Sequence, residues 1–472
     1  MPDEQVVTRE AKSVDDAPAG FYDEDGYVTA AFLERISGFL KAADQQRLRD
    51  ALSELHEAEL GDLLEALEPQ QRAKLVELAG DSFDLTALTE VDEAIRLEII
   101  DALPNAKIAE AVKEIDSDDA VYILEDMEEE DQEEVLAALP FDARLRLRRA
   151  LDYPEESAGR RMQTEFIAVP AYWSVGQAID FMREDRDLPD RFHQIYVVDP
   201  AYKFQGSVSL DRLLRTGRQT RISDILDEDR QTIPGDLDQE EAARLFERYD
   251  LLSAAVVDEN ERLVGVLTID DVVDVIHQEA DEDIKRLGGV GDEELSDSVA
   301  EIARSRFLWL LINLATAILA SAVIGLFDAT IDKMVALAVL MPIVASMGGN
   351  AGTQTMTVAV RALATRDIDN RNAWRIVRRE FVVGFLNGVV FAMIIGVIAA
   401  LWFGEWQLGA IIGAAMIVNL ISAALAGILI PITLDRFDLD PAVASAVFLT
   451  TVTDVVGFFA FLGLAAWWYG VF

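Results

Sequence analysis

A single carboxylic acid lies deep in an apolar part of the sequence. Asp454 follows Thr450, Thr451, Val452 and Thr453. It lies within the long stretch 442–469, which is otherwise mostly apolar. A carboxylate in hydrocarbon costs roughly 2.5–3.5 kcal/mol on insertion scales, so it is expected to face a polar cavity or a partner. No basic residue lies within the apolar stretches to pair with it. This favours a cation site over an interhelical hydrogen bond made by a protonated acid.

A second polar feature interrupts the apolar stretch 334–360. The segment PIVASMGGNAGTQ at 342–354 contains Pro342, three glycines and the amides of Asn350 and Gln354. The two amides are spaced i and i+4, so on a helix they share one face. Non-helical or closely packed backbone is tolerated at membrane depth where it is buried or lines a wet cavity, whereas small residues alone also permit tight helix packing. We interpret the segment as pore-lining.

Acidic residues crowd one short segment before the apolar part, where helical spacing makes them i, i+3 or i+4 neighbours. Same-sign neighbours destabilise a helix unless a cation bridges them, and Mg²⁺ and Ca²⁺ prefer carboxylate oxygens. Solvated acids on an acidic chain are the alternative. The residues concerned are Asp271, Asp274, Glu279, Glu282 and Asp283.

The composition excludes several classes of function. The net charge of the 472 residues is −44, and residues 1–306 hold 75 acids and 33 bases, a net charge of −42. Such a surface excludes nucleic-acid binding through a general basic face. The absence of cysteine excludes thiol catalysis, disulfides and cysteine-bound metals, and three scattered histidines disfavour a transition-metal site. No P-loop motif and no nucleophile–base pair is present, so neither an ATP-driven pump nor an enzyme is expected.

Five apolar stretches follow residue 306, and each reaches the ~20 residues needed to cross a bilayer. Arginines concentrate in the loop 361–379. The excess of basic residues on cytoplasmic loops therefore places this loop and the acidic N-terminal half in the cytoplasm, and the C-terminus outside. The N-terminus has no signal-peptide pattern. The stretches are 307–327, 334–360, 381–403, 408–434 and 442–469.

The preceding residues show two patterns. Apolar residues repeat with helical spacing in a series of short helices. A second region is duplicated with a period of about 60 residues: strands at Gln194–Val198 and Ser253–Val257 are each followed by a second strand, at Gly206–Leu210 and Gly265–Ile269, and then a helix. The predicted fold is a mostly α polytopic membrane protein with five transmembrane helices, preceded by an α-helical repeat domain and an α+β tandem. The predicted parts are a disordered tail (1–20), the helical repeat (21–156), two α+β repeats (157–222 and 223–281), a connector helix (282–306) and the transmembrane domain (307–472).

The duplicated region resembles a tandem of CBS domains, which are regulatory modules. The whole order of parts resembles the MgtE family of magnesium channels over about residues 30–470. The matching motifs are SAGRRM at 157–162, DQEEAARLF at 238–246, EADEDIKRL at 279–287, the glycine-rich segment, and DPAVAS and TTVTDVVG within 440–457.

The resemblance implies a homodimer in the cell membrane that moves Mg²⁺ into the cytoplasm along its electrochemical gradient. It also implies that Mg²⁺ bound to cytosolic acids closes the pore. Mn²⁺, Co²⁺ or Ca²⁺ are alternative ions for the same sites, and ATP is a candidate ligand of the CBS pair. Asp454 and Asn350 are the implied pore metal residues, and Gly348, Gly349, Gly352, Gln354, Ala446 and Thr450 the pore lining. The implied regulatory metal residues are Asp118, Asp238, Glu240, Asp250, Asp271, Asp274, Glu279, Glu282 and Asp283.

Two positions depart from the family pattern. A second acid one turn after Asp118 is replaced by Tyr122, with Glu125 or Asp126 as candidate substitutes, and Ala446-Val447 stands where some members have a polar residue and proline. Two other functions stay open: a membrane-tethered cation sensor that moves no ions, and an ion-coupled divalent-cation exporter.

Overall fold

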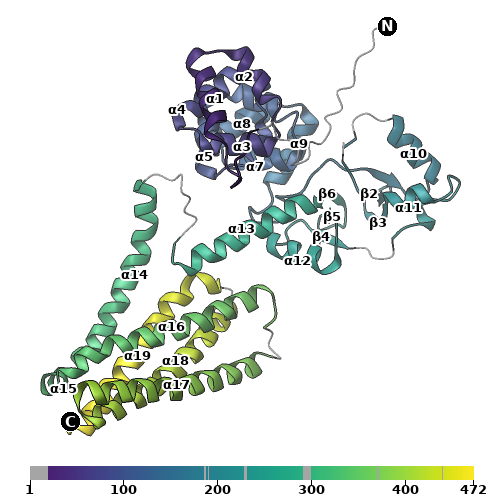
Figure 1. The fold of residues 1–472 in the computed structure, drawn as a ribbon. Coiled ribbons are helices and arrows are strands. Elements are labelled where there is room, and N and C mark those ends of the chain that lie inside the picture. Colours follow the sequence, from purple (N-terminus) through teal and green to yellow (C-terminus); the bar gives the residue numbers. More distant parts are fainter. Residues whose placement is uncertain are drawn as a thin grey trace. The chain divides into compact units, whose positions relative to one another are not determined.

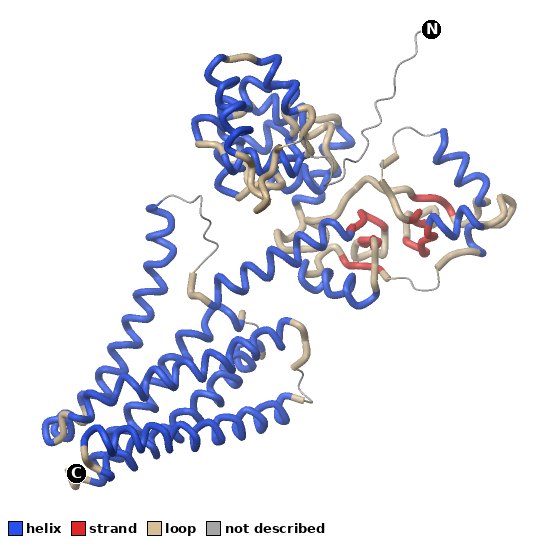
Figure 2. Tube along the Cα trace, in the orientation of Figure 1, coloured by secondary structure: helices blue, strands red, loops and turns tan. Residues whose placement is uncertain are grey.

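The computed structural model describes residues 20–184, 188–189, 191–227, 231–290, 299–368, 372–437 and 439–471. It divides into two compact units, Met1–Glu279 and Ala280–Phe472. Helices dominate both units, and the strands form two small sheets in the first (Figure 2). The predicted fold class is confirmed, whereas the predicted disordered tail lies almost wholly outside the described residues.

The first part of the first unit is a stack of short helices around one apolar core. Local sequence signals set their ends: His56 and Glu59 form a capping box at the start of α3, and Pro69 occupies the first turn of α4. Leucines such as Leu63 and Leu64 are fully buried between the helices. The helices are α1 (Ala30–Ala42), α2 (Gln45–Leu52), α3 (Glu57–Ala66), α4 (Pro69–Ala79), α5 (Glu93–Ala102), α6 (Asn105–Ala111), α7 (Ser117–Glu125), α8 (Glu129–Ala138) and α9 (Phe141–Leu151).

The duplicated region forms two equivalent three-stranded sheets. In each sheet the middle strand pairs in parallel with the first strand and antiparallel with the third. The register shifts at the same point of both, at Val197/Val198 and at Val256/Val257, which confirms the internal duplication. The first repeat contains β1 (Ala168–Pro170), α10 (Val175–Glu184), β2 (Gln194–Val198), β3 (Phe204–Ser209) and α11 (Leu210–Arg215). The second contains β4 (Thr232–Pro234), α12 (Gln239–Tyr249), β5 (Ser253–Val257), β6 (Leu263–Thr268) and α13 (Ile269–Leu287).

The segment that leaves the helical stack belongs structurally to the second repeat. Ser157 bridges to Asp238, and Gln163 bridges to Val266 in β6. The motif SAGRRM is therefore held at the start of α12 and beside β6, although it precedes the first repeat in the sequence.

The second unit contains the long apolar helices, of which α16 to α19 lie side by side (Figure 1). Helix α18 is the central one, because it packs against α16, α17 and α19 and is the most buried. Five helices of the described chain are long and apolar enough to cross a membrane, as predicted. The elements are α14 (Val299–Gly325), α15 (Asp328–Lys333), α16 (Ala336–Ala364), α17 (Ala373–Phe403), α18 (Trp406–Asp435) and α19 (Pro441–Trp468).

Two boundaries differ from the sequence predictions. Helix α17 begins at Ala373, eight residues before its apolar stretch, so it includes Glu380 and three arginines. No separate connector helix begins at 282, because α13 continues from the second repeat to Leu287. The rest of the predicted connector includes residues 291–298, which lie outside the described residues. The glycine-rich segment is helical throughout α16, with Pro342 inside the helix.

Close packing explains the helical glycines in α16. Gly348 lies against the side chain of Asn419 in α18, and the Asn419 amide donates a 2.6 Å hydrogen bond to the carbonyl oxygen of Val344. Gly352 lies against Leu449 in α19. A side chain at either glycine would push the helices apart.

Two adjacent glycines provide a matched test of this packing. In Gly348→Ala, the new Cβ would lie within about 3 Å of Asn419, whereas in Gly349→Ala it would meet nothing within 4 Å. Overpacking costs about 1–3 kcal/mol. We expect Gly348→Ala to lower the thermal midpoint of the detergent-solubilised protein and Gly349→Ala to leave it unchanged. Equal midpoints for the two variants would contradict the packing role.

Candidate cation sites

Helix α19 presents the predicted pore residues on one face. Ala446, Thr450 and Asp454 follow one another at i and i+4, and Thr450 donates a 2.9 Å hydrogen bond to the Ala446 carbonyl oxygen. The Asp454 side chain is half-buried. Among the described residues nothing forms a hydrogen bond or an ion pair with its carboxylate. It therefore keeps its oxygens available for a hydrated ion.

Helix α16 exposes a row of polar side chains in an otherwise apolar element. Ser346, Asn350, Thr353 and Thr357 occur at i, i+4, i+7 and i+11, and all four are exposed. The amide of Asn350 donates only a long 3.4 Å hydrogen bond to Ser346. Thr357 satisfies its hydroxyl on the Thr353 carbonyl oxygen at 3.0 Å, whereas an amide without a short hydrogen bond on a membrane-spanning helix favours water or another protein surface. This face of α16 is therefore suited to line a wet cavity.

The predicted glycines of the pore lining do not all share that face. Gly348 and Gly352 lie at contacts with α18 and α19, so the structure gives them a packing role. Gly349 borders open space. Gln354 is exposed and lines a cavity of about 210 Å³ together with Glu380. A pore-lining role for these residues stays a prediction.

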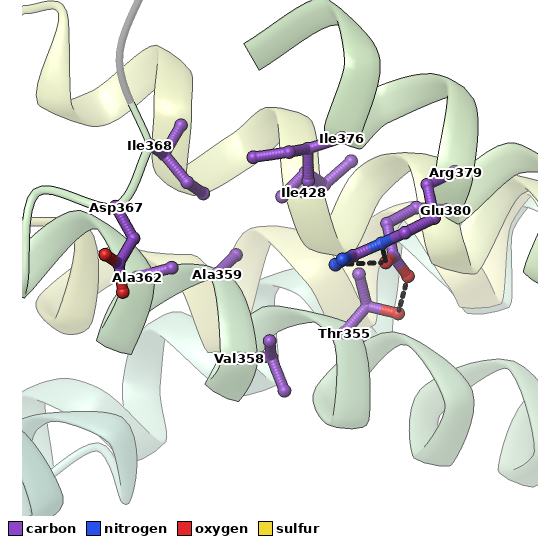
Figure 3. Close-up of a pocket in the computed structure, with 10 residues that line it drawn as sticks. All are labelled: Thr355, Val358, Ala359, Ala362, Asp367, Ile368, Ile376, Arg379, Glu380 and Ile428. Carbon is purple, nitrogen blue, oxygen red and sulfur yellow. Dashed lines mark hydrogen bonds and ion pairs between the residues drawn. The ribbon is translucent and has the colours of Figure 1, made fainter. Parts of the chain in front are cut away.

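Glu380 is another acid in the long helices, and it lies just outside the apolar stretches that the sequence predicts. It borders a cavity of about 310 Å³ between α16, α17 and α18 (Figure 3). Thr355 donates a 3.4 Å hydrogen bond to one carboxylate oxygen, and Arg379 binds the other at 3.2 Å (Figure 3). Because both oxygens have partners, Glu380 differs from Asp454 and has the environment of a structural acid.

In the first unit, two predicted regulatory acids meet between the helical stack and the second repeat. Asp118 lies in the first turn of α7, and Asp271 lies in the first turn of α13. Their carboxyl groups are in contact, and Thr268 donates a 2.5 Å hydrogen bond to Asp271. Asp118 is only 9% exposed, and its Oδ1 has no hydrogen-bond partner among the described residues. An orphaned carboxylate oxygen beside a second carboxylate fits a divalent cation.

The same interface disfavours negative charge. Burial and the Asp271 carboxylate raise the pKa of Asp118, and burial raises the pKa of Asp271. Burial and the charge of Asp118 raise the pKa of Asp119 to about 8. Burial and the charge of Asp274 raise the pKa of Glu90. The acids Asp119 and Glu90 were missed by the sequence analysis, because only tertiary packing brings them beside α13.

The other predicted regulatory acids are dispersed along α12 and α13. Asp238 caps α12 and accepts a 2.9 Å hydrogen bond from the Glu240 amide, while the Glu240 carboxylate pairs with Arg244 at 2.6 Å. Asp250 ends α12 in a left-handed conformation, with a φ of 51°. Burial raises the pKa of Glu279, and the negative charges of Glu240 and Asp238 raise it further.

The end of α13 is tied to the start of α19 within the second unit. Arg286 binds Glu282 one turn earlier and donates a 2.5 Å hydrogen bond to Asp440, which also caps α19. Leu287 packs against the apolar side chains at the ends of α16, α18 and α19. Asp283 lies in the same half-buried turn. The sequence analysis missed this contact because 154 residues separate Arg286 from Asp440.

The described residues contain no group of three or more acidic or histidine side chains placed to hold a metal ion. The candidate sites therefore consist of one or two carboxylates each. Mg²⁺ keeps several of its waters and is commonly bound by one or two carboxylates, so this arrangement suits a hydrated ion better than a fully coordinated one.

Both candidate substitutes for the missing family acid lie beside arginines rather than beside other regulatory acids. Arg161 binds Glu125 at 3.1 Å, and Arg96 binds Asp126. Tyr122 lies between the two guanidinium groups, with its ring centroid 4.2 Å from Arg96 and 5.1 Å from Arg161. The structure therefore pairs this end of α7 with arginines.

Known protein families match three parts of the chain. A family described as "Divalent cation transporter" matches residues 341–464, and one described as "MgtE intracellular N domain" matches residues 55–156. CBS domains match residues 158–218 and 222–278. The magnesium transporter MgtE of Thermus thermophilus is 32% identical over 432 residues, which cover 90% of this chain and 96% of that protein. The chain belongs to the MgtE family of magnesium transporters.

Other MgtE proteins are similar over smaller parts of the chain. The magnesium transporter MgtE of Enterococcus faecalis is 34% identical over 320 residues, which cover 68% of this chain and 71% of that protein. A solved structure described as the cytosolic domain of the Mg²⁺ channel MgtE in complex with ATP is 29% identical, with a TM-score of 0.48, and covers 52% of this chain and 99% of its own. MgtE proteins are transporters and not enzymes.

The raised pKa values predict how the α7–α13 interface depends on pH. The folded-state pKa of Asp119 lies above the ordinary aspartate value of about 3.9. Its contribution to stability is therefore fully present below about pH 4 and is lost as the pH rises through about 8. In EDTA, amide protection of α7 should fall between pH 5.5 and pH 8 by a free energy on the order of 3 kcal/mol at most. Hydrogen exchange of the full chain, corrected for intrinsic rates, measures this.

A neutral isostere provides the control. Asp118→Asn removes one negative charge, so it should raise α7 protection in EDTA at pH 8 and reduce the additional protection given by Mg²⁺. Two results would contradict an interface that negative charge destabilises. One is α7 protection that does not change with pH, and the other is an equal increase by Mg²⁺ in the wild type and in Asp118→Asn.

The contact between α13 and α19 can be tested by a double-mutant cycle. Arg286→Gln and Asp440→Asn each remove the ion pair, while asparagine preserves the helix cap. Since both side chains are 32% exposed, we expect a coupling free energy of about 1 kcal/mol in thermal unfolding. Arg304→Gln, on the exposed start of α14, should combine additively with Asp440→Asn. If the changes in unfolding free energy were additive in the Arg286–Asp440 pair as well as in the Arg304–Asp440 pair, the contact would be ruled out.

Proposed function

We propose that the protein carries Mg²⁺ through the membrane into the cytoplasm along its electrochemical gradient. The observation that carries this proposal is Asp454, a half-buried acid in a membrane-spanning helix without a partner among the described residues. Retaining it in hydrocarbon costs roughly 2.5–3.5 kcal/mol unless an ion or water compensates. The curated relatives are magnesium transporters, which supports Mg²⁺ as that ion.

A second copy of the chain would complete the pore. The polar row on α16 is exposed in a single chain. In the most apolar part of α14, only 6% of the residues are buried. A homodimer that brings two such rows and two Asp454 residues together encloses a polar path and covers apolar surface. In this arrangement Asp454 binds Mg²⁺ through the ion's waters, with Asn350 and Thr450 as further polar contacts.

The membrane potential is sufficient to drive transport. Moving one charge through 100 mV yields about 2.3 kcal/mol, so a divalent ion gains about twice that. The arginines of residues 361–379, between the apolar parts of α16 and α17, and the family match to an intracellular N domain both support a cytoplasmic location of the first unit. The ion would then enter from the outside.

Mg²⁺ in the cytoplasm would also regulate its own entry. At high Mg²⁺ the ion bridges Asp118 and Asp271, displaces their protons and stabilises the docked helical stack. At low Mg²⁺ the carboxylates repel one another wherever protons do not neutralise them. Helix α13 carries Asp271 and ends on α19, so it is the element that would transmit the change. Selectivity against Mn²⁺, Co²⁺ or Ca²⁺, and ATP binding by the CBS pair, stay predictions.

Flux measurements test this function. We expect Mg²⁺ uptake into proteoliposomes to fall at least about tenfold in Asp454→Asn, since the neutral amide no longer attracts the ion. Asp332→Asn, which changes an exposed acid between two spans, should transport like the wild type. Wild-type uptake should also fall as Mg²⁺ on the cytoplasmic face rises.

The outcomes separate the alternatives. Flux that persists in Asp454→Asn would contradict the pore assignment. No flux from a folded wild-type dimer would favour the membrane-tethered sensor. Flux that requires a counter-ion gradient would favour the ion-coupled exporter.

A further inference from the structure

One face of α7 makes two opposite kinds of contact with the second repeat. Its N-terminal end places Asp118 against Asp271, where two acids meet. Its C-terminal end places Tyr122 and Glu125 against Arg161, where opposite charges meet. Residues 118, 122 and 125 recur with helical spacing, so both contacts belong to one docking face. The first contact needs neutralisation by a proton or a cation, whereas the second does not.

The contact at Arg161 is extensive and largely buried. Its Nη1 donates a 3.1 Å hydrogen bond to Glu125 Oε1, and its Nε donates one of 3.1 Å to Gln239 Oε1. Its guanidinium also lies 5.1 Å from the Tyr122 ring centroid. The side chain is 18% exposed, compared with 16% for Glu125. An arginine that stacks on a ring and bonds through its planar fork holds its partners in a fixed geometry.

Neighbouring charges reinforce this contact. Arg160, only 8% exposed, has its Nε 3.7 Å from Glu125 Oε2. Arg96 lies 4.2 Å from the Tyr122 ring centroid and pairs with Asp126. Three guanidinium groups thus surround two carboxylates in a unit that is otherwise strongly acidic. Removing one partner from such a buried pair leaves an uncompensated charge.

A chain of hydrogen bonds extends from this contact to α13. Gln239 accepts from Arg161 and donates a 2.7 Å hydrogen bond to Glu279 Oε1. Gln239 is 6% exposed and is fixed at the first turn of α12. Glu125 of the helical stack is therefore connected to Glu279 on α13 through only two intervening side chains.

We propose that Arg161 is a cation-independent anchor that keeps α7 docked on the second repeat and positions Glu279 on α13. When Mg²⁺ is absent, the docking face opens at Asp118 and pivots about Tyr122 and Arg161, so the helical stack stays attached. The pivot rests on the proposed regulation by Mg²⁺, whereas the anchor does not.

Spin-label distances in the full-length protein test the anchor. The chain has no cysteine, so Glu130→Cys in α8 and Glu247→Cys in α12, both exposed, give one labelled pair. Dilution with unlabelled chains restricts the signal to distances within one chain. The labelled pair should give a single narrow distance distribution in EDTA as well as in Mg²⁺.

Variants distinguish an anchor from a merely structural residue. Arg161→Gln should lose the narrow distribution in EDTA and regain it in Mg²⁺, which also shows that the variant is folded. Arg149→Gln, an exposed arginine of α9, should behave like the parent. Tyr122→Phe retains both ring faces and should keep the narrow distribution in EDTA, whereas Tyr122→Leu should broaden it.

Two results would overturn the anchor. One is a distance distribution of the labelled wild-type pair that is as broad in EDTA as that of Arg161→Gln, and the other is a distribution of Arg161→Gln that stays narrow in EDTA. If Arg161→Gln is broad in EDTA and Mg²⁺ does not narrow it, while circular dichroism shows it folded, the anchor stands and docking by Mg²⁺ fails. The comparison in EDTA therefore judges the anchor, and the response to Mg²⁺ judges the proposed regulation.

Discussion

Repulsion between buried carboxylates is the constraint on which the first unit depends. The helical stack meets α13 through Asp118 and Asp271, in a region whose residues up to 306 carry a net charge of −42. Negative charge of this density resists compaction unless it is neutralised. The interface contains two means of neutralisation: protons on acids with raised pKa values, and arginines at the Tyr122 end. The orphaned Asp118 oxygen is where we propose that Mg²⁺ supplies a third.

Two helices relate the proposed sensing acids to the proposed pore residue. Helix α13 begins beside β6, carries Asp271 and Glu279, and ends where Arg286 contacts Asp440. Asp440 caps α19, the helix that carries Asp454. In the proposed mechanism, a change in the position of α13 would act on the first turn of α19 without any long chain of intermediate side chains. Allosteric coupling of this kind requires a physical element that both sites bias, and α13 is that element in the proposed mechanism.

The sequence predicted the parts of the structure that depend on local pattern. Apolar length identified the five spans, and the repeated period identified the duplication and two of the three strands of each sheet. The early start of α17 was missed, because hydropathy detects only the apolar residues of a helix and not its continuation into arginine-rich sequence. The arrangement of Arg96, Tyr122 and Arg161 was missed because three separate segments meet only in the folded chain. Family resemblance placed Asp118 and Asp271 among the regulatory acids but did not predict their contact, because only tertiary packing brings the two side chains together.

The central claim is that a cation replaces protons between the acids of α7 and α13. Calorimetric titration of the solubilised full-length protein with Mg²⁺ at pH 7, in buffers of different ionisation enthalpy, measures proton release directly. The account predicts net proton release on Mg²⁺ binding, and its loss when Asp118→Asn and Asp271→Asn are combined. Binding without proton release, or release that survives the double substitution, would contradict it.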